Sequence, residues 1–425
     1  MVRVNPPVTR LIKCDLQTDV GPKWIDFVDG GNGCFYGIPS SSRRVLQFKR
    51  RDKSIKEVGP DLGKKGWKYV LGIKANDGCI YCMPAYRNKY VLKIIPGKNQ
   101  DAEVQILKDE KLPRGDWRAG ALANDGCIYL FPYDGSRILK FDPEGGHKLS
   151  IVVHNKIGGE FNAAVLAKDG SIYGISKRQI IIFNPENYSV SIVDLSLESC
   201  YHFFGAVMAG DDSIYTANQY GQILKVDTTT EYLTIIGNRI YSGRGFGWGC
   251  PVLGADKNIY FPPSCHDQVL KFNPRAETIS LVGDSYNDKK DKWVGAVASN
   301  KFIYCIPCRA DNILQIDSCP KDVDVDAIGV KQEENSACNI SRVGSRHEDV
   351  NDGSIRVKME ENCADEILEI DSRHEDVNDG AIRVKMEENR ADNILQIDCR
   401  HDDSIDGAIR VKKEESCADN FFTYE

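Results

Sequence analysis

Three residues of types that bind metals or transfer protons recur at one position of a spaced pattern. Asp116, Glu160 and His202 each lie 13 residues before a tyrosine. Two carboxylates and an imidazole could hold a divalent cation or act as an acid–base group, provided that the fold brings them together. The alternative is a solvated rim where loop residues vary freely. The choice depends on the elements that position the three residues.

The tyrosines themselves mark an internal repeat. Three of them end the phrase Asp-Gly-x-Ile-Tyr, at 77–81, 125–129 and 169–173, and three more follow an isoleucine. They follow one another at intervals of 42 to 48 residues, as Tyr36, Tyr81, Tyr129, Tyr173, Tyr215, Tyr260 and Tyr304. Units of this length that contain several short strand-like runs are typical of a β-propeller. The sequence therefore predicts an all-β, seven-bladed propeller.

Each unit contains four strand-like runs, and the third unit shows them best. Its runs are Trp117–Ala123, Cys127–Pro132, Arg137–Phe141 and Leu149–Val153. Asp-Gly and Asp-Pro pairs supply the backbone angles that tight turns between them require. An aromatic residue opens every unit, and we expect it to pack between neighbouring blades rather than stack on a ligand. These residues are Trp24, Tyr69, Trp117, Phe161, Phe203, Trp248 and Trp293.

The ends of the repeat region indicate how the ring closes. Residues 1–9 form a lead-in, and the propeller spans residues 10–317. Arg10–Gly21 resembles the end of a repeat, so we expect N-terminal strands to complete the blade that the C-terminal end begins. Residues 10–27 and residues 312–317 are both candidates for the third strand of this seventh blade.

Residues 318–425 form an acidic tail with a different repeat. Its four 27-residue units begin at Ser318, Ser345, Ser372 and Cys399, and the segment 309–317 reappears unchanged at 390–398. Each unit is interpreted as a copied hairpin, with strands such as 381–386 and 393–398. Because little apolar surface remains in these copies, we expect weakly ordered hairpins or a disordered chain. The tail carries a net charge of −14 and the rest of the chain +7.

Composition favours a soluble protein of a reducing compartment. The first twenty residues contain no secretory signal, and no apolar run of 18 residues occurs in the chain. The fifteen cysteines are odd in number and show no paired spacing, as expected for reduced thiols. We therefore expect a cytoplasmic or nuclear location without membrane contact.

Two other groups of residues have the spacing of metal ligands. Cys79 and Cys82, and likewise Cys305 and Cys308, are three residues apart, but both pairs fall on predicted strands, where such residues point to opposite faces. Packing is the favoured interpretation. The tail histidines at 347, 374 and 401 stand beside carboxylates, and duplication alone explains their period.

Basic residues are predicted to collect on the face of the ring where the channel opens. Loops between blades, and loops between second and third strands, emerge there. The candidates for anion binding are Lys23, Lys68, Arg43, Arg44, Arg87, Arg137, Arg178 and Arg244. Such a field favours a protein segment or another anionic ligand, including the acidic tail of the same chain. Nucleic acid ranks lower, because aromatic residues are not interleaved with the basic loops.

The region from Arg10 to Asp317 repeats the pattern W-x-x-G-x-L-x-x-D-G-x-I-Y-x-x-P…V-L-x-x-D-P…V-G. This unit resembles the repeats of kelch-type or NHL-like propellers. The resemblance implies a repeat fold and no particular activity. Our first hypothesis is a non-catalytic binding scaffold that uses the basic channel-mouth face and has no cofactor. The general shape is also similar to gluconolactonase and strictosidine-synthase-like propellers, whose chemistry lies at the channel mouth. By analogy, our second hypothesis is a metal-dependent hydrolase or lactonase, with Asp116, Glu160 and His202, found by aligning the repeats, around a divalent ion. A binding module covered by its tail is the third.

Overall fold

The computed structural model describes residues 9–319 and five strands of the tail. Within 9–319 it leaves out residues 15, 17–20, 65, 86–87, 99, 109–111, 114, 134, 155–156, 196–201, 244 and 288–289. Strands, turns and irregular segments make up the described part, without an α-helix. Accordingly, no described segment is a helix long and apolar enough to cross a membrane.

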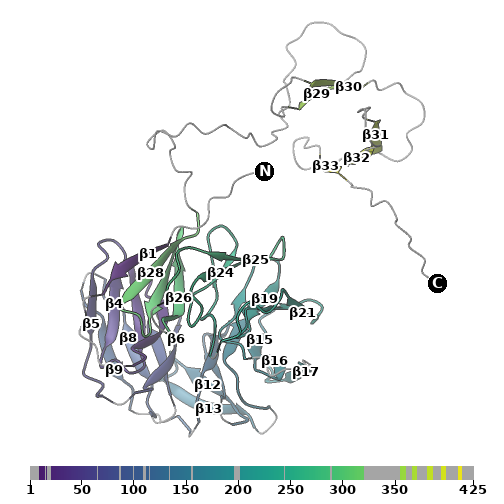
Figure 1. Cartoon of the computed structure of the whole chain (residues 1–425). Helices are drawn as coiled ribbons and strands as arrows, with labels where there is room; N and C mark the ends of the chain where they lie inside the picture. Colours follow the sequence, from purple (N-terminus) through teal and green to yellow (C-terminus); the bar gives the residue numbers. More distant parts are fainter. Residues whose placement is uncertain are drawn as a thin grey trace, which may run out of the picture. The chain divides into compact units, whose positions relative to one another are not determined.

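Seven antiparallel sheets of four strands follow one another along the chain, and each is one blade of a β-propeller (Figure 1). The first three blades comprise β2 (Trp24–Asp29), β3 (Cys34–Pro39), β4 (Val45–Lys49) and β5 (Ile55–Val58); β6 (Tyr69–Lys74), β7 (Ile80–Pro84), β8 (Leu92–Ile95) and β9 (Glu103–Ile106); and β10 (Ala119–Leu122), β11 (Ile128–Phe131), β12 (Ile138–Asp142) and β13 (Lys148–Val153). The predicted strands of the third unit agree with β10 to β13 within two residues at either end.

Three further blades continue the same pattern. They comprise β14 (Ala163–Leu166), β15 (Ile172–Ile175), β16 (Gln179–Phe183) and β17 (Val190–Asp194); β18 (Val207–Met208), β19 (Ser213–Ala217), β20 (Ile223–Asp227) and β21 (Leu233–Ile236); and β22 (Val252–Leu253), β23 (Ile259–Phe261), β24 (Val269–Asn273) and β25 (Thr278–Val282). The first strands of the fifth and sixth blades are only two residues long. The prediction of seven blades is confirmed.

The seventh blade joins the two ends of the ring. It contains β26 (Trp293–Ser299), β27 (Phe302–Pro307), β28 (Asn312–Asp317) and, as its fourth strand, β1 (Thr9–Lys13). In Figure 1 the purple β1 lies beside the green β28, and the two are antiparallel with Leu11 opposite Leu314. Closure by an N-terminal strand is therefore confirmed, and it covers the edge of β28. Residues 312–317 form the third strand, so the alternative that placed 10–27 there is wrong.

The aromatic residue that opens each unit packs between blades, as predicted. All seven are at most 3% exposed. Three of the tryptophans also donate their indole N–H to a carbonyl at the beginning of the third strand: Trp24 to Arg44 (3.0 Å), Trp248 to Gln268 (2.9 Å) and Trp293 to Asn312 (2.7 Å). The bond satisfies a buried donor and fixes the first strand of the blade against the third.

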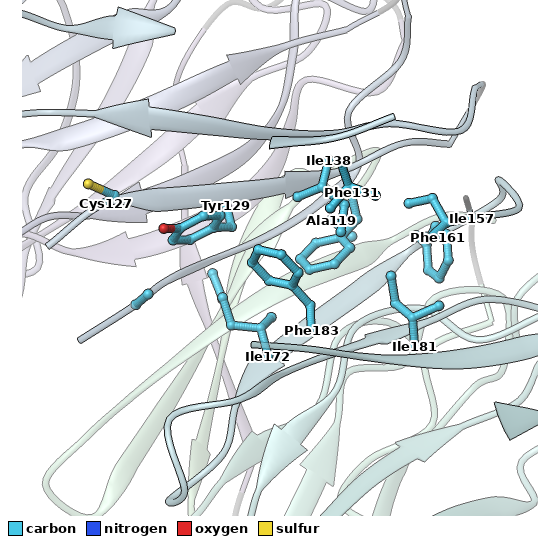
Figure 2. Close-up of a cluster of buried hydrophobic side chains, with 13 residues drawn as sticks. Ala119, Cys127, Tyr129, Phe131, Ile138, Ile157, Phe161, Ile172, Ile181 and Phe183 are labelled. Atoms are coloured by element: carbon cyan, nitrogen blue, oxygen red, sulfur yellow. The ribbon is translucent and has the colours of Figure 1, made fainter. Parts of the chain in front are cut away.

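The core lies between adjacent blades, as the cluster between the third and fourth blades illustrates (Figure 2). Phe131 of β11 meets Phe183 of β16 edge to face, with ring centroids 6.1 Å apart. Tyr129, Phe161 and Ile172 complete this part of the cluster, and all are buried. Side chains therefore alternate along each strand between the two neighbouring blades, so every blade is buried on both faces.

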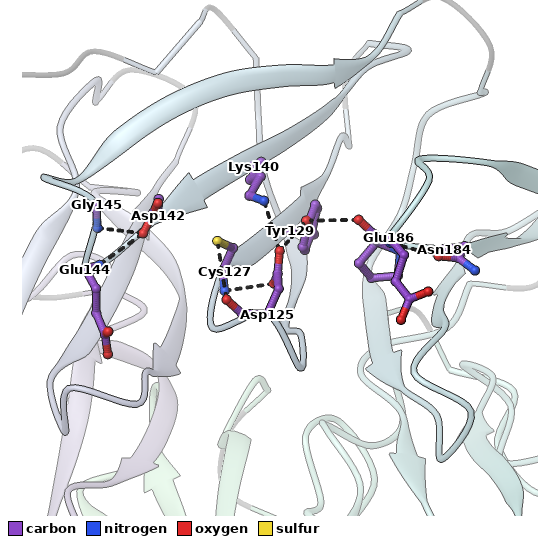
Figure 3. A network of polar contacts seen from close by, with 10 residues as sticks. Asp125, Cys127, Tyr129, Lys140, Asp142, Glu144, Gly145, Asn184 and Glu186 are labelled. Carbon is purple, nitrogen blue, oxygen red and sulfur yellow. Dashed lines mark hydrogen bonds and ion pairs between the residues drawn. The ribbon is translucent and has the colours of Figure 1, made fainter.

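The repeated phrase Asp-Gly-x-Ile-Tyr forms a hydrogen-bonded turn (Figure 3). In the third blade one oxygen of Asp125 accepts the Cys127 amide at 3.0 Å and the other accepts the Tyr129 hydroxyl at 2.8 Å. Lys140 of β12 pairs with the same carboxylate at 2.9 Å and lies over the Tyr129 ring. Gly126 takes the left-handed conformation, φ 78°, that the turn requires.

The second and sixth blades repeat this arrangement of tyrosine, aspartate and lysine. Tyr81 and Lys93 bind Asp77, and Tyr260 and Lys271 bind Asp256. Burial alone raises the pKa of Asp125, yet hydrogen bonds from Lys140, the Cys127 amide and Tyr129 lower it below its usual value. The phrase that identifies the repeat therefore locks the second strand to its turn and to the third strand.

We expect Tyr129→Phe to lower the free energy of unfolding by about 1–2 kcal/mol, because it removes a buried hydrogen bond to an ionised group. The matched control is Tyr173→Phe, in which the lost hydroxyl donates to the Thr228 carbonyl at 3.3 Å. That change should cost only about 0.5–1 kcal/mol. Urea unfolding of both variants measures the difference. Equal losses would contradict a special role for the aspartate.

The two cysteines of each pair pack in different hydrophobic clusters, as expected for residues that point to opposite faces of a strand. Cys79 packs in the cluster between the second and third blades, whereas Cys82 packs between the first and second. Cys305 and Cys308 are divided between two clusters in the same way. Burial raises the pKa of Cys79 to about 11 and that of Cys308 to about 12, so these thiols stay protonated at neutral pH.

In the tail the structure describes two small antiparallel sheets. One pairs β29 (Ile355–Met359) with β30 (Glu366–Ile370), and the other contains β31 (Ala381–Lys385), β32 (Ile394–Asp398) and β33 (Arg410–Lys413). In the second sheet Ala381 lies opposite Asp398. These strands fall where the sequence predicts copied hairpins. The tail histidines lie outside the described residues.

Candidate functional site

The residue that precedes each opening aromatic belongs to a belt of main-chain hydrogen bonds around the channel mouth, the end of the ring where first strands begin. Five of these bonds, of 2.8–3.2 Å, join neighbouring blades: Lys23 N–H to Cys308, Lys68 to Ser40, Glu160 to Tyr133, Gly247 to Gln219 and Lys292 to Ser264. Lys23, Lys68, Asp116 and Lys292 are buried. Asp116, Glu160 and His202 therefore occupy a repeat position whose backbone helps to hold the ring together.

Each of the two predicted acids has a cation as its partner. Asp116 is 1% exposed and accepts a hydrogen bond of 2.7 Å from Nε of Arg118. Glu160 pairs with Lys177 at 3.3 Å. Among the described residues, no group of three or more His, Cys, Asp or Glu side chains is arranged to hold a metal ion. Asp116, Glu160 and His202 thus do not form a metal-binding cluster in the part of the chain that the structure describes.

Several cations predicted for the basic face are also paired. Lys23 binds Asp311 at 3.3 Å, Arg43 binds Asp61, and Arg44 donates to the Gly59 carbonyl. Lys68 donates to the carbonyl of Ser41 at 3.0 Å. Arg137 and Arg178 are exposed, while Arg87 and Arg244 lie outside the described residues. The two ion pairs weaken the field of the face, because a neutralised cation attracts a distant anion little, whereas Arg44 and Lys68 bind carbonyls and keep their charge.

A pocket of about 400 Å³ lies at the channel mouth over the third to sixth blades. Its lining combines one guanidinium, one imidazole, two amides, four aromatic rings and two glycines: Arg118, His202, Asn162, Gln219, Tyr133, Phe204, Tyr220, Phe246, Gly243 and Gly245. Aromatic rings combined with converging polar groups are found in small-molecule sites, and the volume lies within the usual range. Of the predicted trio, only His202 lines this pocket.

Arg118 is held in place from two sides. Its Nε–H binds the buried carboxylate of Asp116, and its guanidinium carbon lies 3.7 Å from the centroid of the Tyr133 ring. No other hydrogen-bond acceptor for this guanidinium is found among the described residues. A planar guanidinium with fixed orientation and further N–H donors can bind a carboxylate or phosphate in two-point geometry.

His202 is fixed through its backbone and is neutral at pH 7. Its amide donates to Oε1 of Gln219 at 2.5 Å, and its ring meets Phe246 edge to face. Burial lowers the pKa of the imidazole below its usual value, and the nearby Lys177 lowers it further, although Glu160 opposes the effect. A neutral imidazole can donate or accept one hydrogen bond, or remove a proton from a ligand.

Phe204 forms the inner wall of the pocket. It packs against an apolar cluster of Ile25, Val294 and Cys308, which belong to the first and seventh blades. It also lies 5.3 Å from Phe246, measured between ring centroids. The side chain therefore reaches from the fifth blade to the first and seventh, and separates the pocket from that side of the channel.

Three pocket residues occupy a repeat position that the sequence argument passed over. Arg118, Asn162 and Phe204 each lie 11 residues before a repeat tyrosine, two residues after the position of the predicted trio. The first, second and sixth blades have Ile25, Val70 and Gly249 there. Polar residues in two blades, at a position that is apolar or glycine in the others, are the signal that could have identified this site.

No protein-family model and no curated protein matches the chain. Among solved structures, it is similar to a catalytically inactive histidine-to-alanine variant of virginiamycin B lyase from Staphylococcus aureus with quinupristin, at 14% identity and a TM-score of 0.60, over 73% of this chain and 99% of the lyase. It is also similar to YCF48 bound to D1 peptide, at 12% identity and a TM-score of 0.55, over 74% of this chain and 96% of YCF48. A third similar structure is Kuenenia stuttgartiensis hydrazine synthase, at 12% identity and a TM-score of 0.54, over 71% of this chain and 97% of that chain. Likeness at this level of identity shows the fold and no activity. By its strand order, ring closure and neighbours, the chain is a seven-bladed β-propeller.

Proposed function

We propose that this protein is a non-catalytic binding module whose channel-mouth pocket takes an organic group with a negative charge. The observation that carries the proposal is Arg118, which lines an aromatic pocket while Asp116 and Tyr133 hold its guanidinium. Because its orientation is set before a ligand arrives, little conformational entropy is lost on binding. We still propose an anionic ligand, as the sequence predicts. The residue that we propose to bind it is Arg118 rather than the arginines of the loops.

The size and lining of the pocket favour a small molecule or a chain end over a folded surface. A volume of about 400 Å³ accommodates a group of roughly ten to twenty non-hydrogen atoms. The amides of Asn162 and Gln219 offer further donors and acceptors, and Phe204 and Phe246 offer apolar contact. The ligand should therefore combine an acid with an apolar body.

Calorimetry with matched probes tests this function. Benzoate and phenyl phosphate should bind, with an affinity that decreases as salt increases, because part of the attraction is between charges. Benzamide has the same ring but no charge, and it should bind at least 10-fold more weakly than benzoate, since a hydrogen bond to an ionised group contributes about 1.5–3 kcal/mol. Benzamide and benzoate binding equally well would contradict the proposal.

A lyase or hydrolase that uses His202 as general base is the second candidate. It is favoured by one observation, the neutral imidazole in the pocket wall. The lyase of similar fold was solved as a variant inactivated by loss of a histidine, so the same architecture supports such chemistry in that protein. The metal-dependent version is not proposed, because the described residues supply no ligand group for it.

The pH dependence of binding and of rate distinguishes the two functions. Burial lowers the pKa of His202 below its ordinary value, so the imidazole gains charge only as the medium becomes acidic. In a binding module the affinity for benzoate should therefore rise as the pH is lowered from 7 to 5.5, and His202→Gln should abolish the rise. In an enzyme the rate should fall over that range, because a protonated base cannot accept a proton.

A further inference from the structure

Trp67 differs from the other tryptophans of the chain. The chain has five, and Trp67 is 48% exposed while the other four are at most 3% exposed. It lies in the loop that leads from the first blade into β6, at the channel mouth. A single exposed indole on a face with a binding pocket is a candidate contact surface, because its flat apolar ring can stack on a ligand that enters the pocket.

The backbone holds this indole in an unfavourable conformation. Trp67 has φ 55°, in the left-handed region that bulky residues rarely adopt. Of eleven such non-glycine residues in the described part, eight lie in hairpin turns, and only Trp67, Glu160 and Asp291 lie in loops between blades. Strain of this kind persists only where the surroundings impose it, and it gathers at binding sites.

The next residue shows what imposes the conformation. The Lys68 amide donates to Ser40 in the belt, and its ammonium group donates to the Ser41 carbonyl at 3.0 Å. Lys68 is buried, so the chain is anchored immediately after Trp67. The indole is therefore presented by a fixed backbone rather than by a free loop.

Arg118 connects Trp67 to the pocket. Its guanidinium carbon is 5.9 Å from the Trp67 ring centroid and 3.7 Å from that of Tyr133, which lines the pocket. A cation beside an aromatic face is a stabilising arrangement, and an acid bound to Arg118 would place its attached group next to the indole. The site thus continues out of the pocket, over Arg118, onto Trp67.

We infer that the ligand is an aromatic acid whose charged group binds Arg118 and whose flat ring stacks on Trp67. This inference rests on the proposed binding function and adds the class of ligand. An indole face prefers a flat π-system to a saturated ring, and offset stacking strengthens contact beyond the area buried. The bound acid also balances the guanidinium charge next to the ring.

Two acids of equal charge test the inference. We expect 1-naphthoate to bind the full-length protein more tightly than cyclohexanecarboxylate, and to protect Trp67 fluorescence from quenching by acrylamide. Trp67→Ala should weaken naphthoate roughly 3- to 10-fold and change cyclohexanecarboxylate less than about 2-fold. Trp67→Phe should restore part of the loss. Tyr232→Ala, which removes another exposed aromatic ring (71%) in the turn between β20 and β21, is the control and should change neither affinity.

The outcomes separate this inference from the proposed function. If naphthoate binding requires Arg118 but is the same in Trp67→Ala, the stacking inference is overturned and the pocket function stands. If Trp67→Ala weakens both acids equally, the indole acts by packing and not by recognising a ring, which also overturns the inference. If neither acid binds the intact protein, the inference and the proposed function both fail.

Discussion

Replacing Ile12 with Asp is expected to lower the free energy of unfolding by about 2–4 kcal/mol, because it places a charge against an apolar cluster. Ile12 lies on β1 opposite Ile313 and packs against the cluster that contains Phe35, Leu46 and Tyr304. This is the joint between the seventh blade and the first. Loss of β1 from the joint would open the ring and expose the edge of β28.

Leu11→Asp is the matched control, because Leu11 is the neighbouring residue on the same strand but is 48% exposed. It should cost less than about 1 kcal/mol. Urea unfolding followed by tryptophan fluorescence measures both variants. A small and equal effect of the two substitutions would show that closure by β1 contributes little to the stability of the ring.

Arg118→Gln is expected to weaken the binding of benzoate and 1-naphthoate by roughly 10- to 100-fold, the equivalent of one or two hydrogen bonds to an ionised group. The glutamine is polar, but it is shorter than arginine and lacks the charge. Because Asp116 then loses its partner in a buried position, the stability of the variant should be measured beside its affinity.

Arg118→Lys separates charge from geometry. A lysine keeps the positive charge but cannot bind an acid through a planar fork or stack on Tyr133 as a guanidinium does. We expect it to recover only part of the lost affinity. The affinity that it recovers should decrease as the salt concentration increases. Full recovery by lysine would mean that the site attracts anions by charge alone, without the two-point contact described above.

The sequence was sufficient for the fold because the fold repeats. One phrase, whose tyrosine bonds the aspartate four residues earlier, forms the same turn in several blades, so each copy supports the interpretation of the others. The end of the ring was harder to predict. A short N-terminal strand such as Thr9–Lys13 has the pattern of a third or a fourth strand alike, and only its pairing with β28 decides which.

The site could be predicted only in part, because it depends on places where the repeat is broken. Counting from the tyrosines led to Asp116 and Glu160, whose charges serve Arg118 and Lys177. The same count led to His202, which lines the pocket. Trp67 carried no signal in the sequence, since neither its exposure nor its left-handed backbone angle follows from its residue type.

The central claim is that the pocket at the channel mouth binds an aromatic acid through Arg118. A crystal structure of the protein with 4-bromo-1-naphthoate tests it most directly, because the anomalous signal of bromine locates the ring without bias. The account predicts one bromine site at the mouth, with the carboxylate on Arg118 and the ring against Trp67. Bromine at another surface of the ring, or a carboxylate at the mouth that does not contact Arg118, would contradict it.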